Sequence, residues 1–65
     1  MKICDYFSNE NYCGSLAEYI KVIKNNTEIY HGRIMTLLNN NEIANYALID
    51  EPIFENGIGY IVYVE

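Results

Sequence analysis

The sequence predicts an α+β fold in which a single helix packs on a three- to four-stranded antiparallel sheet, in the order β-α-β-β-β with a terminal meander. Residues 15–25 place apolar side chains at helical spacing, and the second half of the chain contains apolar runs separated by Asn- and Gly-containing turns. Hydrophobic residues make up 51% of the chain and include seven tyrosines, which excludes a disordered composition. With 65 residues, we expect one small domain over residues 1–65.

The N-terminal segment alternates between two sets of side chains, which predicts a short strand over residues 1–7. Ile3, Asp5 and Phe7 would face one way. An aspartate is unfavourable inside a strand, so this segment fits a strand less well than the other predicted strands do. The polar residues 8–11 are expected to form a loop.

A capping pattern and an apolar stripe predict a helix over residues 15–25. Ser15 and Glu18 have the spacing of a capping box, in which each side chain bonds the other's backbone amide. Two lysines suit the last turn, and Asn25 and Asn26 tolerate the left-handed conformation that ends many helices. The apolar stripe consists of Leu16, Tyr19, Ile20 and Ile23.

The second half of the chain predicts a three-stranded meander. Residues 29–38 and 43–49 are apolar runs, and the three asparagines at 39–41 form a turn between them. Pro52 cannot donate a backbone hydrogen bond, so it ends the second run or places it at a sheet edge.

The final strand is predicted at residues 58–64, after a hairpin turn at Asn56-Gly57. That dipeptide is typical of type I′ turns, which need positive φ at both central positions. The final strand is apolar on both faces, whereas one helix can cover only one face of a sheet. Its other face would then need a second copy or another protein as cover.

The charges are divided unevenly along the sequence. All four Lys and Arg residues lie within residues 1–33, where four acids balance them. The net charge of −5 therefore belongs to the rest of the chain, which repels nucleic acid and attracts basic protein surfaces. We expect a protein partner with a basic surface and no direct nucleic-acid binding. The acids after residue 33 are Glu42, Asp50, Glu51, Glu55 and Glu65.

No arrangement of residues predicts catalysis, a metal or a cofactor, so we expect a protein that is not an enzyme. His31 is the only histidine that could act as a triad base, and no spacing links it to Cys13 or Ser15. Cys4, Cys13 and His31 supply three ligands at irregular spacing, where structural zinc sites use four. The cysteines are expected as reduced thiols, with a disulfide as the alternative.

We expect no targeting or membrane-spanning segment. Polar residues interrupt the N-terminus, and the longest apolar runs are about five residues, whereas a membrane helix needs about 20. We expect no membrane contact and a cytoplasmic location in a bacterium or a phage-infected cell. The Asn-, Ile- and Tyr-rich composition suits an AT-rich genome of that kind.

The leading functional hypothesis is a small acidic protein-binding module that blocks a basic surface. In size and charge the chain is similar to phage-encoded inhibitors of host defence nucleases, including anti-CRISPR proteins that mimic DNA, although no motif links it to them. One alternative is a homo-oligomeric accessory protein, such as a homodimer, that assembles through its sheet edge or open sheet face. Another is weak activity on a small molecule around Cys4, Cys13 or His31. The expected partner-binding residues are Asp50, Glu51, Glu55, Glu42 and Tyr63.

Overall fold

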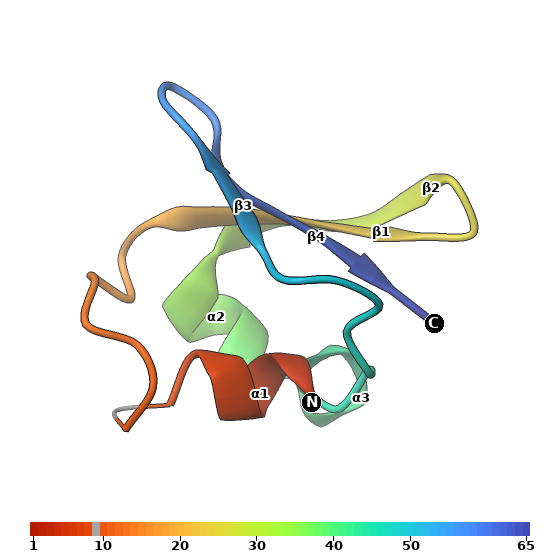
Figure 1. Ribbon diagram of the computed structural model, residues 1–65, viewed down its shortest axis with the longest axis horizontal. Helices are drawn as coiled ribbons and strands as arrows, with labels where there is room; N and C mark the ends of the chain where they lie inside the picture. The colour runs from red at the N-terminus through yellow and green to blue at the C-terminus, as the bar shows by residue number, and fades with distance from the viewer. Residues whose placement is uncertain (9) are drawn as a thin grey trace.

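The computed structural model describes residues 1–8 and 10–65, in which a four-stranded mixed sheet has three short helices on one side (Figure 1). The strand order is β2-β1-β4-β3, with β1 and β4 parallel and the other two pairs antiparallel. The α+β class is confirmed, but the single helix and the all-antiparallel sheet are wrong. Asn9, in the loop predicted at residues 8–11, lies outside the described residues. The elements are α1 (Ile3–Tyr6), β1 (Tyr19–Lys24), β2 (Thr27–Arg33), α2 (Ile34–Leu38), α3 (Asn41–Ala44), β3 (Ile53–Glu55) and β4 (Gly59–Val64).

Strand β1 occupies much of the segment predicted as a helix, so the helix over residues 15–25 is wrong. The Ser15 hydroxyl accepts from the Ala17 amide at 3.1 Å, and the Glu18 carboxylate accepts from the Tyr19 amide at 3.1 Å. These bonds shape a turn before the strand instead of capping a helix. The β-branched residues that follow are stiff at χ1 and favour the extended chain.

A two-residue hairpin joins β1 to β2. Lys24 pairs with Thr27 across the turn, and Asn25 and Asn26 have φ values of 52° and 63°. Positive φ at both central positions is the conformation of a type I′ turn, whose twist matches that of the strands. The left-handed tolerance of these asparagines therefore makes a hairpin and does not end a helix.

The N-terminal segment predicted as a strand forms helix α1. The Lys2 amide donates to the Asp5 carboxylate at 3.3 Å, which explains the aspartate that fitted a strand poorly. Ile3 and Phe7 are four residues apart and both fully buried, as neighbours on one helix face can be. Lys2 also forms an isolated antiparallel bridge with Ala47, so only this short contact is extended.

The strand predicted over residues 29–38 ends at Arg33, and its second half is helix α2. Ile34 and Leu37 lie three residues apart, on one side of a helix, and both are fully buried. In a continued strand they would point to opposite faces, and one of them would be exposed.

The segment predicted as a strand over residues 43–49 instead completes helix α3 and continues into two isolated bridges. Asn40 caps this helix: its side-chain oxygen accepts from the Glu42 and Ile43 amides at 3.1 and 3.2 Å. The predicted break at residues 39–41 therefore exists, but it separates two helices.

The predicted final strand is confirmed as β4, although it is a central strand and not the end of a meander. The hairpin predicted at Asn56-Gly57 also exists, between β3 and β4. Gly57 has φ +86° while Asn56 does not have positive φ, so the predicted type I′ turn is wrong. Gly59, at φ +103°, lies so close to the Tyr19 carbonyl that a Cβ would collide with it.

The helices cover one face of the sheet and leave the other open (Figure 1). Ile20 and Val22 of β1 and Val62 and Val64 of β4 are almost fully buried against the helices. The alternate positions face the other way, because strand side chains alternate between faces. In the described part of the chain, no helix is long and apolar enough to cross a membrane. The open face carries Tyr19, Lys21, Ile23, Glu28, His31, Arg33, Ile53, Glu55, Ile61 and Tyr63.

Candidate functional site

The candidate site lies where the N-terminal segment passes the stretch between α3 and β3. The Leu48 amide donates to the Met1 carbonyl at 2.8 Å, and the Ile49 amide donates to the Tyr63 carbonyl at 2.9 Å. Leu48 also bridges to Val64 of β4. These bonds tie residues 48–49 to both the N-terminus and the sheet, so the residues that follow are held beside α1.

Two adjoining hollows occur at this junction and share Met1 and Asn11; together we name them the acidic groove. The first, of about 290 Å³, is lined by Met1, Tyr6, Asn11, Leu48, Asp50 and Glu51. The second, of about 640 Å³, is lined by Met1, Asp5, Ser8, Glu10 and Asn11. The Asn11 side-chain Nδ2 donates to the Asp5 carbonyl at 2.9 Å, which fixes the wall that the two hollows share.

Four exposed carboxylates line the acidic groove, and they come from two chain segments far apart in sequence. Among the described residues the ion pair formed is Lys21 with Glu28, at 3.7 Å on β1 and β2. None of the four carboxylates is therefore paired with a Lys or Arg of the described chain. Grouped like charges raise the local concentration of cations. The four are Asp5, Glu10, Asp50 and Glu51.

Apart from Asn11, the rest of the first hollow is apolar or aromatic. Met1 and Leu48 supply hydrocarbon, and Tyr6 supplies a ring beside two carboxylates. A long cationic side chain could lay its stem on such a wall and place its charged head at the carboxylates. The ring adds a cation–π contact when the charge lies over its face. The acidic groove therefore has the chemistry to receive a Lys or Arg side chain.

An aromatic cluster supports α1 next to the acidic groove. Phe7 meets the rings of Tyr6, Tyr12 and Tyr60 edge to face, with centroids 4.9–5.3 Å apart. The Tyr12 hydroxyl donates to the Ser15 carbonyl at 2.9 Å. Desolvation, followed by the neighbouring Tyr60 hydroxyl, raises the pKa of Tyr12 from 10.0 to about 12.

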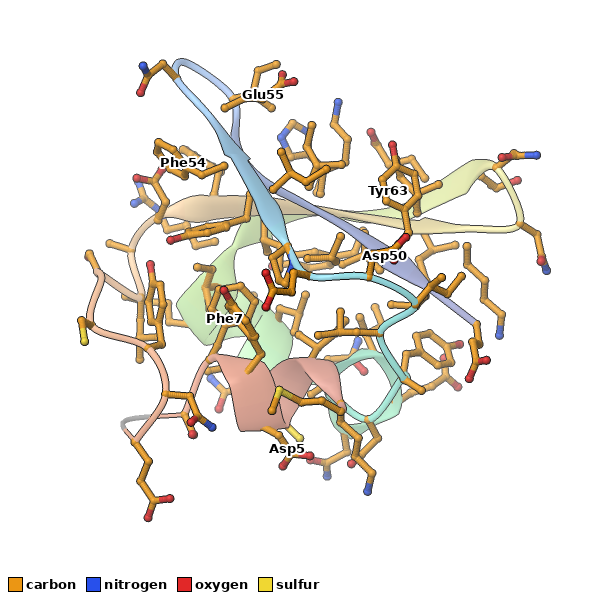
Figure 2. The ribbon with its side chains drawn as sticks, in the orientation of Figure 1. Asp5, Phe7, Asp50, Phe54, Glu55 and Tyr63 are labelled. Atoms are coloured by element: carbon orange, nitrogen blue, oxygen red, sulfur yellow. The ribbon has the colours of Figure 1, made fainter. Side chains whose placement is uncertain are left out.

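The structure brings together only two of the five predicted contact residues. Asp50 and Glu51 lie side by side in the first hollow of the acidic groove. Glu55 stands on the β3–β4 hairpin, away from Asp50 (Figure 2). Glu42 lies in the first turn of α3, and Tyr63 is on the open sheet face with 42% of its surface exposed. Their partner-binding role stays a prediction.

The sequence reasoning missed Asp5 and Glu10, because it counted them as balanced by the lysines of the same half of the chain. In space two of these lysines lie elsewhere: Lys21 is on the open face, and the Lys24 ammonium lies 4.3 Å from the centre of the Tyr46 ring. The available signal was the Lys2–Asp5 spacing of a helix start. A helical interpretation of residues 3–6 would have placed Asp5 near an exposed turn.

The remaining candidate residues, Cys4, Cys13 and His31, are not among the residues that line the acidic groove. Cys4 is half-buried and Cys13 exposed, and both thiols are free. In the described part of the chain, no three His, Cys, Asp or Glu side chains gather closely enough to hold a metal ion. His31 is exposed on β2, where its ring lies 6.2 Å from that of Tyr19. That the protein needs no cofactor and is not an enzyme stays a prediction.

The chain gave no significant match to any protein-family model, curated protein or solved structure. The functional argument therefore depends on the chemistry of its own surfaces. Two of these surfaces carry it: the acidic groove and the open sheet face.

Proposed function

We propose that this protein is a small non-catalytic binding module whose acidic groove takes basic side chains of another protein and so blocks a basic surface. The observation that carries the proposal is the group of four unpaired carboxylates beside an apolar wall. Two come from the α1 region and two from the stretch before β3.

Several cationic groups of the partner would have to bind together. An exposed ion pair contributes only about 0.2–1 kcal/mol, so one arginine in the groove would give little affinity. An arginine of the partner would gain affinity from bidentate hydrogen bonds to Asp50 or Glu51 and from contact between its hydrocarbon stem and Leu48. A partner with an extended basic surface fits these requirements better than a single small cation. The net charge of −5 would also speed the encounter and make it sensitive to salt.

The partner we propose is a nucleic-acid-binding surface of a host defence nuclease, which the chain would cover as a phage-type inhibitor. Such a surface offers the clustered Lys and Arg residues that contact phosphates. Groove carboxylates would take the place of phosphates on that surface, as in nucleic-acid mimics of the anti-CRISPR kind. Small size and negative charge support this finer proposal, as they support the coarser one.

Neutralising the groove in the double variant Asp50→Asn/Glu51→Gln should weaken binding of a short arginine-rich peptide roughly tenfold, because two pairs of up to about 1 kcal/mol each are lost. Isothermal titration calorimetry at low and raised salt measures this. The matched control, Glu28→Gln/Glu65→Gln, removes the same charge outside the acidic groove and should change affinity little.

Equal weakening by both double variants would mean that overall charge, and not the groove, binds the peptide. Glu55→Gln tests separately whether the hairpin contributes to the contact. Cleavage assays with purified CRISPR nucleases test the finer proposal: inhibition by the wild type that Asp50→Asn/Glu51→Gln loses would support it. No inhibition by the wild type would remove the nuclease as partner and leave the groove's peptide binding to be judged by calorimetry.

The open sheet face favours a second candidate function, homo-oligomeric assembly. Ile53 has 52% and Tyr63 42% of its surface exposed there, next to the half-buried Ile23 and Ile61. Uncovered apolar side chains on one face are typical of a surface that another molecule covers. Sedimentation at high protein concentration separates the two functions, since a strict monomer would exclude assembly through this face.

A further inference from the structure

The open sheet face contains a hollow whose described lining, unlike that of the acidic groove, includes a lysine and no carboxylate. The tip of the β3–β4 hairpin rises on the side of the sheet away from the helices, and it forms one wall of the hollow (Figure 1). Strands β1 and β2 form the floor. This open-face hollow measures about 320 Å³ and is lined by Tyr19, Lys21, His31, Gly57 and Ile58.

The Tyr19 ring is held in place and yet remains accessible in the open-face hollow. The Arg33 guanidinium carbon lies 5.1 Å from the ring centre, and the His31 ring meets it edge-on at 6.2 Å. Arg33 is itself fixed, because its Nη1 donates to the Ala17 carbonyl at 2.8 Å. Tyr19 nevertheless has 45% of its surface exposed. A fixed, exposed aromatic ring is a ready surface for stacking.

The open-face hollow is also bordered by cations. Lys21 lines it, and Arg33 stands behind Tyr19. Two carboxylates also lie on this face: Glu55 at the base of the hairpin, and Glu28, which is paired with Lys21 at 3.7 Å. Both side chains of that pair are partly exposed, Lys21 at 30% and Glu28 at 48%. Such exposed pairs are weak, so an anionic ligand can compete with Glu28 for the ammonium group.

We propose that the open-face hollow binds a nucleoside phosphate, independently of the function proposed above. The base would stack on Tyr19 and contact Ile58, while the phosphate would pair with Lys21 and accept from His31. The volume of about 320 Å³ lies at the lower end of ligand pockets, which suits a mononucleotide. The ligand could be a free nucleotide or the phosphorylated end of a strand. The net charge of −5 repels a long polyanion, so we expect the free nucleotide to bind better.

Titration of the isotope-labelled protein with adenosine 5′-monophosphate, followed by amide chemical shifts, tests the proposal. We expect saturable shifts centred on the residues of the open-face hollow, with a dissociation constant on the order of millimolar. Adenosine alone and inorganic phosphate alone should each bind about tenfold more weakly, because each lacks one of the two contacts. Phosphate binding as tightly as the nucleotide, adenosine doing so, or the absence of saturable shifts would each overturn the proposal.

Two lysines of β1 provide a matched pair of variants. Lys21→Gln should weaken nucleotide binding about tenfold by removing a charged donor. Lys24→Gln makes the same charge change on the opposite face, where Lys24 lies over Tyr46, and should leave binding unchanged. Equal weakening by both variants would overturn the proposal in favour of overall charge. Tyr19→Leu should weaken binding about tenfold through lost stacking, and an unchanged affinity would count against the base contact.

A 5′-phosphorylated oligonucleotide and an acidic peptide distinguish the sources of the ligand. Saturable binding of the oligonucleotide more weakly than the free nucleotide supports a mononucleotide site, and tighter binding supports recognition of strand ends. Tighter binding of the acidic peptide at the same residues would overturn the proposal, since the hollow would then receive carboxylates of a protein.

Discussion

The two sides of the sheet differ in both packing and charge. The helix side contains the fully buried residues of the core, such as Ile20 and Val62, and the acidic groove lies at its margin. The open side carries partly exposed apolar residues together with Lys21 and Arg33. A net charge of −5 therefore describes neither surface, because the sheet separates an acidic region from a face where Lys21 and Arg33 are balanced by Glu28 and Glu55. Even a chain of 65 residues can present two surfaces suited to opposite ligands.

Two isoleucines on the same strand measure the difference in packing directly. Ile20→Ala should lower the free energy of unfolding by about 2–5 kcal/mol, since Ile20 is fully buried on the helix side. Ile23→Ala on the open face should cost only about 1 kcal/mol, because Ile23 is half-buried. Urea denaturation measures both values. Equal losses at high protein concentration would show that another copy covers the open face in solution.

Two glycines of the β3–β4 hairpin region sharpen the comparison between the sheet interior and the open side. Gly59→Ala should cost about 2–4 kcal/mol, because a Cβ would collide with the Tyr19 carbonyl in addition to the strain at φ +103°. Gly57→Ala should cost only about 1–2 kcal/mol from its left-handed backbone, since a Cβ there meets no described atom within 4 Å. Thermal or urea unfolding checks that Gly59→Ala costs more stability than Gly57→Ala. A larger loss for Gly57→Ala would show that the hairpin tip, and not Gly59, packs against other atoms.

The smallest expected effect concerns a tyrosine on the helix side. Because the pKa of Tyr12 is raised from 10.0 to about 12, its contribution to stability is complete below pH 10 and is lost as the pH rises towards 12. Tyr12→Phe should remove a late ionisation, near pH 12, from an ultraviolet titration and should make stability less dependent on pH in this range. Tyr63→Phe on the open face should keep that late transition. A late transition that persists in Tyr12→Phe would contradict the assignment.

The positions of the turns could be predicted from the sequence better than the helices and strands beside them. The breaks predicted at Asn25-Asn26 and Asn56-Gly57 are present as turns, because Asn and Gly accept positive φ and are therefore typical of turns. The helix predicted over residues 15–25 failed because its pattern fits two periods. Ile20 and Ile23 are three residues apart, as on a helix, but Ile20 and Val22 are two apart and buried together, as in a strand.

The mixed topology could not be predicted, because it depends on pairing between segments far apart in sequence. Val22 pairs with Val62 in the parallel β1–β4 ladder, and no local pattern indicates that partner. The candidate site shares this limit. The acids Asp50 and Glu51 could be identified from charge alone, but their position beside the N-terminal segment depends on the hydrogen bond between Leu48 and Met1.

The position of β4 also determines when the protein can fold during synthesis. This strand is made after the other three, yet it lies between β1 and β3 and supplies Val62 and Val64 to the core. A nascent chain that ends before residue 59 can form the β1–β2 hairpin, but Ile20 and Val22 then lack their β4 partners, Tyr60 and Val62. Contacts this distant in sequence form slowly and together. Ribosome-bound intermediates should therefore stay accessible to chaperones and proteases until residues 59–64 leave the exit tunnel.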